Sequence, residues 1–201
     1  IEIPKDNGKA IADATAKATP EEYQMVRISQ AFIITAGQRI VNKITGYNKI
    51  QGLAHKQNAY RSELGGIDGI LSVLEVIVDY YNITYRAIEL ALDGKSAPKQ
   101  ANLEVFLQAG QSSFDILQDI QYSIRHLPIA VSFRWVEGHQ HEKGKQLDWW
   151  GRQNEQVDML AKNFLWRNLN NWIYKSSQLW YERWAIYLHR SKISSINNKT
   201  I

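Results

Sequence analysis

Hydrophobic and polar residues alternate over the first part of the chain, as they do in β-strands. Residues 9–16 place Asp13 and β-branched residues on one face and small alanines on the other. Residues 25–35 and 39–45 are rich in β-branched side chains, and the Ala-Gly-Gln sequence between them predicts a hairpin turn. The pattern therefore predicts three antiparallel strands, followed by a polar loop over residues 46–57.

The middle of the chain carries the three- and four-residue spacing of an amphipathic helix. Apolar residues recur at this spacing over residues 58–81 and form one stripe, with Glu63 near the first turn. Residues 85–92 alternate again and predict a fourth strand, which ends before Gly94. We expect a short helix over residues 97–107 and then a loop.

A helix, a strand and a further helix follow this loop. Residues 114–127 form an amphipathic pattern that Pro128 stops, and residues 129–136 predict a fifth strand. A polar loop over residues 137–148 leads to a last helix over residues 150–167. The chain thus changes from successive strands to alternating helices and strands.

This order of elements predicts an α/β fold. Three antiparallel strands with two later parallel additions give a five-stranded mixed sheet that has helices on both faces. We expect residues 1–168 to form this domain. Residues 169–201 are rich in tryptophan and basic side chains, with a predicted hairpin over residues 185–195. We interpret them as a C-terminal extension packed on the domain, or as a connector to a neighbouring one.

Composition limits the classes of protein and of metal site. The 201 residues are 44% hydrophobic and 11% aromatic, which is typical of a globular protein with one core. No apolar run approaches the ~20 residues needed to span a bilayer. Without cysteine, any metal must be bound by oxygen or imidazole ligands, which suits Mg or Mn. The net charge of +4 suits a polyanionic partner, and we expect a cytoplasmic or nuclear protein that is not secreted.

Four carboxylates lie in short motifs on four predicted elements. They are Asp13 in IADAT, Glu63 in YRSEL, Asp93 in LALDG and Asp158 in NEQVD, and His139 in WVEGHQ precedes the last of them. Carboxylates that meet at one sheet edge can hold two Mg²⁺ ions about 3.5–4 Å apart, which stabilise an in-line displacement at phosphorus. Such acids raise one another's pKa until metal binds.

Each of these residues also has an ordinary structural interpretation. Asp93 before a glycine is a common turn pair, and Glu63 suits the first turn of a helix. Asp158 fits a solvated helix face, and His139 fits an exposed loop. Asp13 is harder to explain in this way, because an acid within an otherwise small, apolar strand is costly unless it is paired or binds a metal.

Taken together, the motifs resemble type 1 ribonuclease H domains, and most resemble those carried in retroelement polyproteins beside a reverse transcriptase. The resemblance extends from the first predicted strand to the last predicted helix. Asp13 matches the aspartate of the family's first strand, and Glu63 matches its helix glutamate. Asp93 matches the aspartate that closes the fourth strand, and Asp158 matches the aspartate of the last helix. His139 matches a mobile-loop histidine that assists product release or proton transfer.

The resemblance implies a metal-dependent endonuclease that hydrolyses the RNA strand of RNA/DNA hybrids and leaves a 3′-hydroxyl and a 5′-phosphate. It implies two Mg²⁺ ions, with Mn²⁺ as a substitute, held by the four carboxylates, and His139 as a further catalytic residue. The implied partners are the hybrid duplex and a reverse transcriptase domain of the same polyprotein. The 2′-hydroxyl distinguishes RNA from DNA at the cleaved position.

The sequence departs from the family pattern in three places. The family has Gly-Ser after its first aspartate, whereas this chain has Ala14 and Thr15. The loop after His139 is longer, and His141 competes with His139 for the same role. The region before Phe114 lacks the lysine-rich insertion of cellular members, so a neighbouring domain would have to supply part of the grip on the duplex.

Two alternative functions fit parts of the same pattern. The first is a transposase, integrase or exonuclease on the same fold, against which the Glu63 and NEQVD motifs argue. The second is a non-catalytic or partner-dependent nucleic-acid-binding module, since a fold alone does not establish activity. At the start of the last helix, Trp149 and Trp150 fit the core better than a stacking surface for bases. Lys95 and Ser96, at a predicted helix start, are placed to meet a phosphate.

Overall fold

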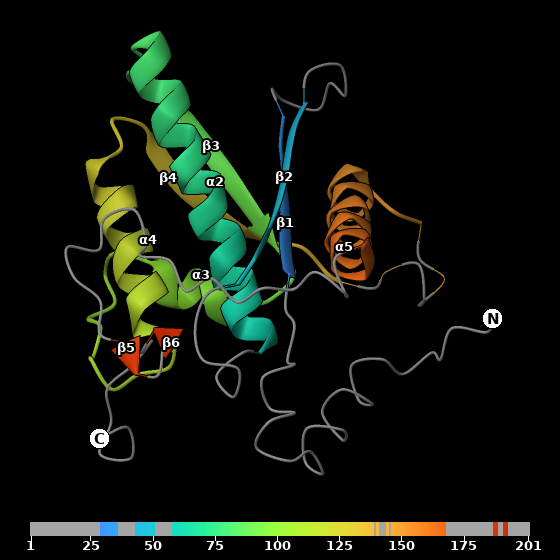
Figure 1. The fold of residues 1–201 in the computed structure, drawn as a ribbon. Helices are drawn as coiled ribbons and strands as arrows, with labels where there is room; N and C mark the ends of the chain where they lie inside the picture. Colours follow the sequence, from blue (N-terminus) through green and yellow to red (C-terminus); the bar gives the residue numbers. More distant parts are fainter. Residues whose placement is uncertain are drawn as a thin grey trace.

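The computed structural model describes ten helices and strands in the residue ranges 29–35, 43–50, 58–138, 140, 144, 146–167, 187–188 and 191–192 (Figure 1). The strands are β1 (Ser29–Thr35), β2 (Lys43–Lys49), β3 (Ala87–Leu92), β4 (Ala130–Trp135), β5 (Tyr187–Leu188) and β6 (Ser191–Lys192). The helices are α2 (Ala59–Tyr81), α3 (Ser96–Ala101), α4 (Phe114–His126) and α5 (Trp149–Arg167). The predicted first strand, with Asp13, lies outside the described residues.

The strands of the main body form two separate sheets. β1 and β2 pair antiparallel, with Phe32 opposite Gly46, and β3 and β4 pair parallel, with Leu90 opposite Phe133. The protein is therefore mixed α/β, as predicted. In the described part of the chain the strands do not join into the single five-stranded sheet that the sequence predicts. That finer arrangement stays a prediction.

The second strand differs from the sequence prediction. Residues 39–45 were expected to be extended and residue 46 to begin a loop, whereas β2 continues to Lys49. The prediction ends the strand before Gly46, because a glycine in a strand pattern usually indicates a break. Here a Cβ at Gly46 would overlap the ring of its partner Phe32, so the missing side chain lets the ring lie across the strand.

Helix α2 confirms the predicted amphipathic helix and sets the position of Glu63. Asn58 caps its N-terminus, where the side-chain oxygen accepts a hydrogen bond from the Arg61 backbone N–H at 2.8 Å. Asn82 ends it in the left-handed conformation, with φ of 49°. The apolar stripe of α2 packs against α4 and forms the core with β3.

The helices lie on two sides of the strands (Figure 1). α2 and α4 cover one side, and their buried residues contact Leu90 of β3. α5 packs against β1 and β2 on the other side. A buried ion pair joins α2 to α4, in which Arg61 donates to both carboxylate oxygens of Asp115 at 2.8 and 2.7 Å.

Helix α3 is shorter than the prediction of residues 97–107. It ends at Ala101, and Asn102 is extended. The buried Gln121 of α4 explains this end, because its Nε2 donates to the carbonyls of Asn102 and Val105 at 2.9 and 3.0 Å. The side chain thus holds the backbone in a turn where the sequence pattern would continue a helix.

The C-terminal part contributes a small antiparallel pair, β5 with β6, at the place of the predicted hairpin. The division of the chain at residue 168 stays a prediction. Among the helices described, none has a stretch long and apolar enough to cross a membrane.

Candidate active site

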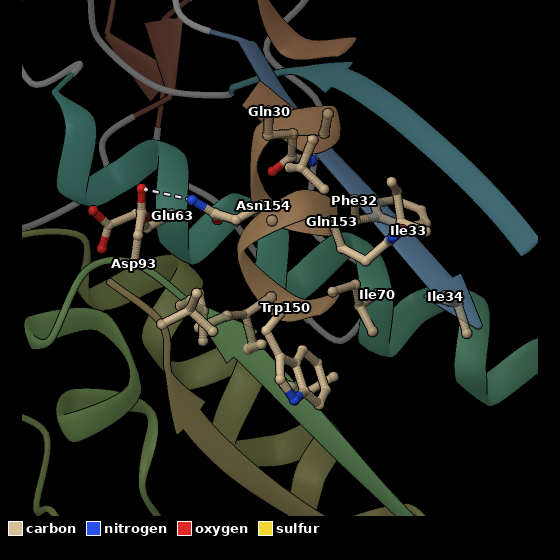
Figure 2. Close-up of a pocket in the computed structure, with 18 of the residues that line it drawn as sticks. Gln30, Phe32, Ile33, Ile34, Glu63, Ile70, Asp93, Trp150, Gln153 and Asn154 are labelled. Atoms are coloured by element: carbon tan, nitrogen blue, oxygen red, sulfur yellow. Dashed lines mark hydrogen bonds between the residues drawn. The ribbon is translucent and has the colours of Figure 1, made fainter. Parts of the chain in front are cut away.

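The structure brings two of the predicted acids together at the carboxyl end of β3. Asp93 follows the last residue of that strand, and Glu63 extends from the second turn of α2 (Figure 2). A Cβ at Gly94 would overlap the Glu63 carboxylate. That carboxylate therefore lies against the backbone immediately after Asp93, and only a glycine leaves it this space. The pair occupies the sheet edge that the sequence predicts.

The electrostatics of the pair favour a cation. Burial raises the pKa of the Glu63 carboxyl above its ordinary value of 4.5, and the negative charge of Asp93 raises it further. Burial and the Glu63 charge also raise the pKa of the neighbouring Tyr60. Glu63 Oε2 is buried and has no hydrogen-bond partner among the described residues. A divalent ion would satisfy this oxygen and offset the like charges.

Several groups hold Asp93 in place. The indole nitrogen of Trp135 donates a hydrogen bond to its backbone carbonyl at 2.9 Å. Asn154 of α5 donates to its carboxylate at 3.5 Å, the contact dashed in Figure 2. A Cβ at Gly138 would lie 3.1 Å from Asp93 Oδ2, so the chain leaving β4 passes directly beside the carboxylate. Asp93 thus lies between β4 and α5.

Asp158, the third predicted acid in the described ranges, is paired with a lysine and not with Glu63 or Asp93. Its Oδ2 accepts a hydrogen bond from Lys162 Nζ, one turn further along α5, at 2.6 Å, and its side chain is 49% exposed. No group of three or more acidic or histidine side chains in the described ranges lies close enough to hold a metal ion. The structure therefore unites Glu63 and Asp93 and leaves Asp158 apart from them.

The two remaining predicted residues lie outside the described ranges. These are Asp13 and His139, and the alternative histidine, His141, is outside them as well. Gly138, the residue before His139, is described and lies against Asp93. The metal-ligand and catalytic roles of Asp13 and His139 stay predictions.

Asn154 is a site residue that the sequence analysis did not identify as functional. It lies one helical turn before Asp158 on α5, so the two residues share a helix face. The asparagine reaches Asp93 where the aspartate does not. The signal was present as the first residue of the NEQVD motif, but only the aspartate was assigned a role.

A cavity of about 710 Å³ opens beside the acids, between β1, β3, α2 and α5 (Figure 2). Every residue from Gln30 to Thr35 and from Ala87 to Asp93 lines it. Successive residues of a strand point to opposite faces, so a cavity that touches all of them meets the strand edges and not one face. The edges of β1 and β3 that lack a described partner therefore face each other across this space.

Trp149 and Trp150 form part of the wall on the α5 side. Their rings meet edge to face at 4.7 Å, and both are partly buried and line the cavity. The guanidinium of Arg134 lies 5.3 Å from the centre of the Trp150 ring. Neither tryptophan is among the buried core residues, so their interpretation as core residues stays a prediction.

Comparison with protein-family models gives no match for this sequence, and neither does comparison with curated proteins.

Proposed function

We propose that the chain is a metal-dependent endonuclease of the type 1 ribonuclease H kind, which hydrolyses the RNA strand of RNA/DNA hybrids. The observation that carries the proposal is the pairing of Glu63 with Asp93 at the carboxyl end of β3. An acid that is partly buried beside a second acid, with one oxygen unsatisfied and a raised pKa, is a candidate for a functional site. The choice of RNA/DNA hybrid hydrolysis as the reaction rests on the resemblance of the motifs, including those around Asp13 and Asp158.

The cavity supports the finer fold that the sequence predicts. Residues 9–16 have the length of a strand, and we place them between β1 and β3, antiparallel to the first and parallel to the second. Such a strand would satisfy both open edges and join the two sheets into one of five strands. It would also bring Asp13 to the acid pair as a third carboxylate.

Glu63 and Asp93 are the described side chains on which a divalent-cation site would be built. Glu63 and Asp93 would hold the metal first, Asp13 would add a ligand from the new strand, and Asp158 would join after leaving Lys162. Two Mg²⁺ ions, or Mn²⁺ as a substitute, would supply an activated water and would stabilise the leaving 3′-oxygen. Asn154 orients the Asp93 carboxylate, and His139, or His141 in its place, moves a proton or assists product release.

One observation favours the second candidate, a partner-dependent nucleic-acid-binding module. Asp158 is already paired with Lys162, so a complete ligand set requires that this pair opens. A reverse transcriptase domain of the same polyprotein is the proposed partner that would help to assemble the site and grip the duplex. We propose a cytoplasmic or nuclear location for either function.

Cleavage of an end-labelled RNA strand in an RNA/DNA hybrid tests the proposal. The full chain is incubated with Mg²⁺, Mn²⁺ or EDTA, beside single-stranded RNA and duplex DNA as alternative substrates. We expect metal-dependent cutting of the hybrid RNA only, reduced by about 100-fold or more in Asp93→Asn.

Asp79→Asn is the matched control, because it makes the same change at an exposed residue near the far end of α2. Cutting that survives Asp93→Asn would identify a contaminating nuclease. A folded protein that cuts nothing with either metal, but binds the hybrid, would favour the binding module.

A further inference from the structure

A lysine and a tryptophan form a paired surface beside the two acids. The ammonium of Lys95, two residues after Asp93, lies 4.2 Å from the centre of the Trp135 ring. The tryptophan is 48% exposed, and Lys95 is exposed as well. The indole nitrogen donates to the Asp93 carbonyl at 2.9 Å, which fixes the ring next to the acid pair.

The Trp135 side chain is held without being buried. Its one polar atom is satisfied by the Asp93 carbonyl, so part of the ring remains open to solvent and to the ammonium of Lys95. A cation over an aromatic face is attracted by the ring without being neutralised by a carboxylate. Among the described residues Lys95 makes no ion pair with an acid, and its side chain is exposed.

We propose that Lys95 and Trp135 form a contact site for the sugar-phosphate backbone of a nucleic acid strand and position that strand at Glu63 and Asp93. The acids repel phosphate, and a fixed cation beside them offsets this repulsion. The ammonium contacts a phosphodiester oxygen, and the exposed ring contacts the adjoining sugar. Contact with the backbone makes the site independent of base sequence. The identity of the strand as part of a hybrid rests on the proposed function.

The dependence of binding on salt separates this role from a purely structural one. Each phosphate that a protein neutralises adds about 0.7–0.9 to the slope of log K against log salt concentration. Binding of a fluorescent RNA/DNA hybrid to the full chain is measured by anisotropy in EDTA, where metal-dependent cleavage is off. We expect Lys95→Ala to lower the slope by this amount and to weaken binding about threefold or more, irrespective of base sequence.

Two variants serve as controls for this measurement, and a third tests the ring. Lys99→Ala removes an exposed lysine of helix α3, which begins directly after Lys95, and should leave the slope unchanged. Lys95→Arg keeps the charge and should restore the parental slope. Trp135→Leu removes the ring and should weaken binding even though the lysine remains.

The outcomes for the contact site and for the nuclease proposal are distinguishable. Equal slopes for the parent, Lys95→Ala and Lys99→Ala, or no measurable binding by the folded parent at low salt, would overturn the contact site. If binding depends on Lys95 while the parent cuts no hybrid with Mg²⁺ or Mn²⁺, the contact site stands and the nuclease proposal fails. If the parent cuts hybrid RNA while the slopes are equal, the nuclease proposal stands alone.

Discussion

The position of the Glu63 side chain lowers the stability of the folded protein. Its carboxylate is partly buried, lies beside the charge of Asp93 and has an oxygen without a described partner. A glutamine would keep the shape and lose the charge. Residues kept in such surroundings commonly serve a function for which some stability is given up.

Glu63→Gln should make the metal-free protein more stable at neutral pH. In the parent, the pKa of this carboxyl is higher in the folded state than in the unfolded state. The folded state therefore binds the proton more tightly, and the free energy of unfolding falls as the pH rises from about the ordinary value through the raised one. The variant should lack this fall and have a higher Tm above that range, by a few degrees.

Thermal melts of the two proteins at several pH values, with and without Mg²⁺, measure this effect. The metal should raise the Tm of the parent and not that of the variant, because ligands that bind the native state stabilise it. A parent whose stability is flat over the acid range, or a variant that Mg²⁺ still stabilises equally, would contradict the role given to Glu63.

Lys162→Ala should lower the Mg²⁺ concentration needed for half-maximal cleavage. The lysine holds Asp158 at 2.6 Å, and its removal frees that carboxylate for metal. The loss of stability should be small, about 0.3–0.5 kcal/mol, since the pair is exposed and spans one helical turn. Lys162→Arg keeps the pair and serves as the control. An unchanged Mg²⁺ requirement in the alanine variant would argue against Asp158 as a ligand.

At the scale of single residues, the sequence motifs predicted that Glu63 and Asp93 lie together, but not that Asp158 pairs with Lys162. A motif reports which element carries a residue, and a strand end beside a helix start places two acids together. It does not report which rotamer an exposed carboxylate adopts. That choice depends on a lysine four residues away, and the contact of Asn154 with Asp93 depends on how α5 is rotated.

At the scale of elements, one ion pair fixes the helix that carries Glu63. Arg61 is fully buried and binds Asp115 through two hydrogen bonds, which join α2 to α4. The arginine lies two residues before Glu63. The pair therefore restrains the first turns of α2, where the acid must be held against the end of β3.

Asp115→Ala should lower the free energy of unfolding by about 3–5 kcal/mol, because it removes the carboxylate that binds the buried Arg61 guanidinium. Urea denaturation of the full chain measures the change. The double variant Arg61→Met with Asp115→Leu should recover much of the loss, since apolar residues of similar volume often replace buried ion pairs well. A single variant as stable as the parent would contradict the structural role of the pair.

Periodicity predicted the long helices within one or two residues but failed at β2 and at the end of α3. Helix α2 has an apolar stripe and an asparagine cap that are visible in the sequence. The continuation of β2 through Gly46 depends on the ring of Phe32 on another strand. The early end of α3 depends on Gln121, which is distant in the chain. Local patterns do not contain such contacts.

At the scale of the whole molecule, the two sheets and their helices surround a cavity that our proposal assigns to residues 9–16. A mixed α/β architecture follows from the sequence pattern, and the structure has it. The single sheet depends on pairings between the first strand and two strands far along the chain. Such long-range pairing is the feature that local patterns specify least.

Removal of residues 1–20 should expose the cavity and destabilise the fold. If residues 9–16 pair with β1 and β3 as proposed, the shortened protein should bind the dye ANS and melt at a lower temperature than the full chain, because the strand edges and apolar walls would lose that cover. Asp13→Asn in the full chain is the control, since it removes the acid but keeps the strand. A shortened protein with parental stability and no dye binding would contradict the location of residues 9–16.

The cavity also has a consequence for inhibition. Its volume of about 710 Å³ falls within the range of sites that bind drug-sized molecules, and its walls are largely apolar. Under the proposed fold, a small molecule that entered it would compete with residues 9–16 and would keep the two sheets from joining. Such a compound would block the proposed site without chelating metal, and its selectivity would come from side chains other than Glu63 and Asp93.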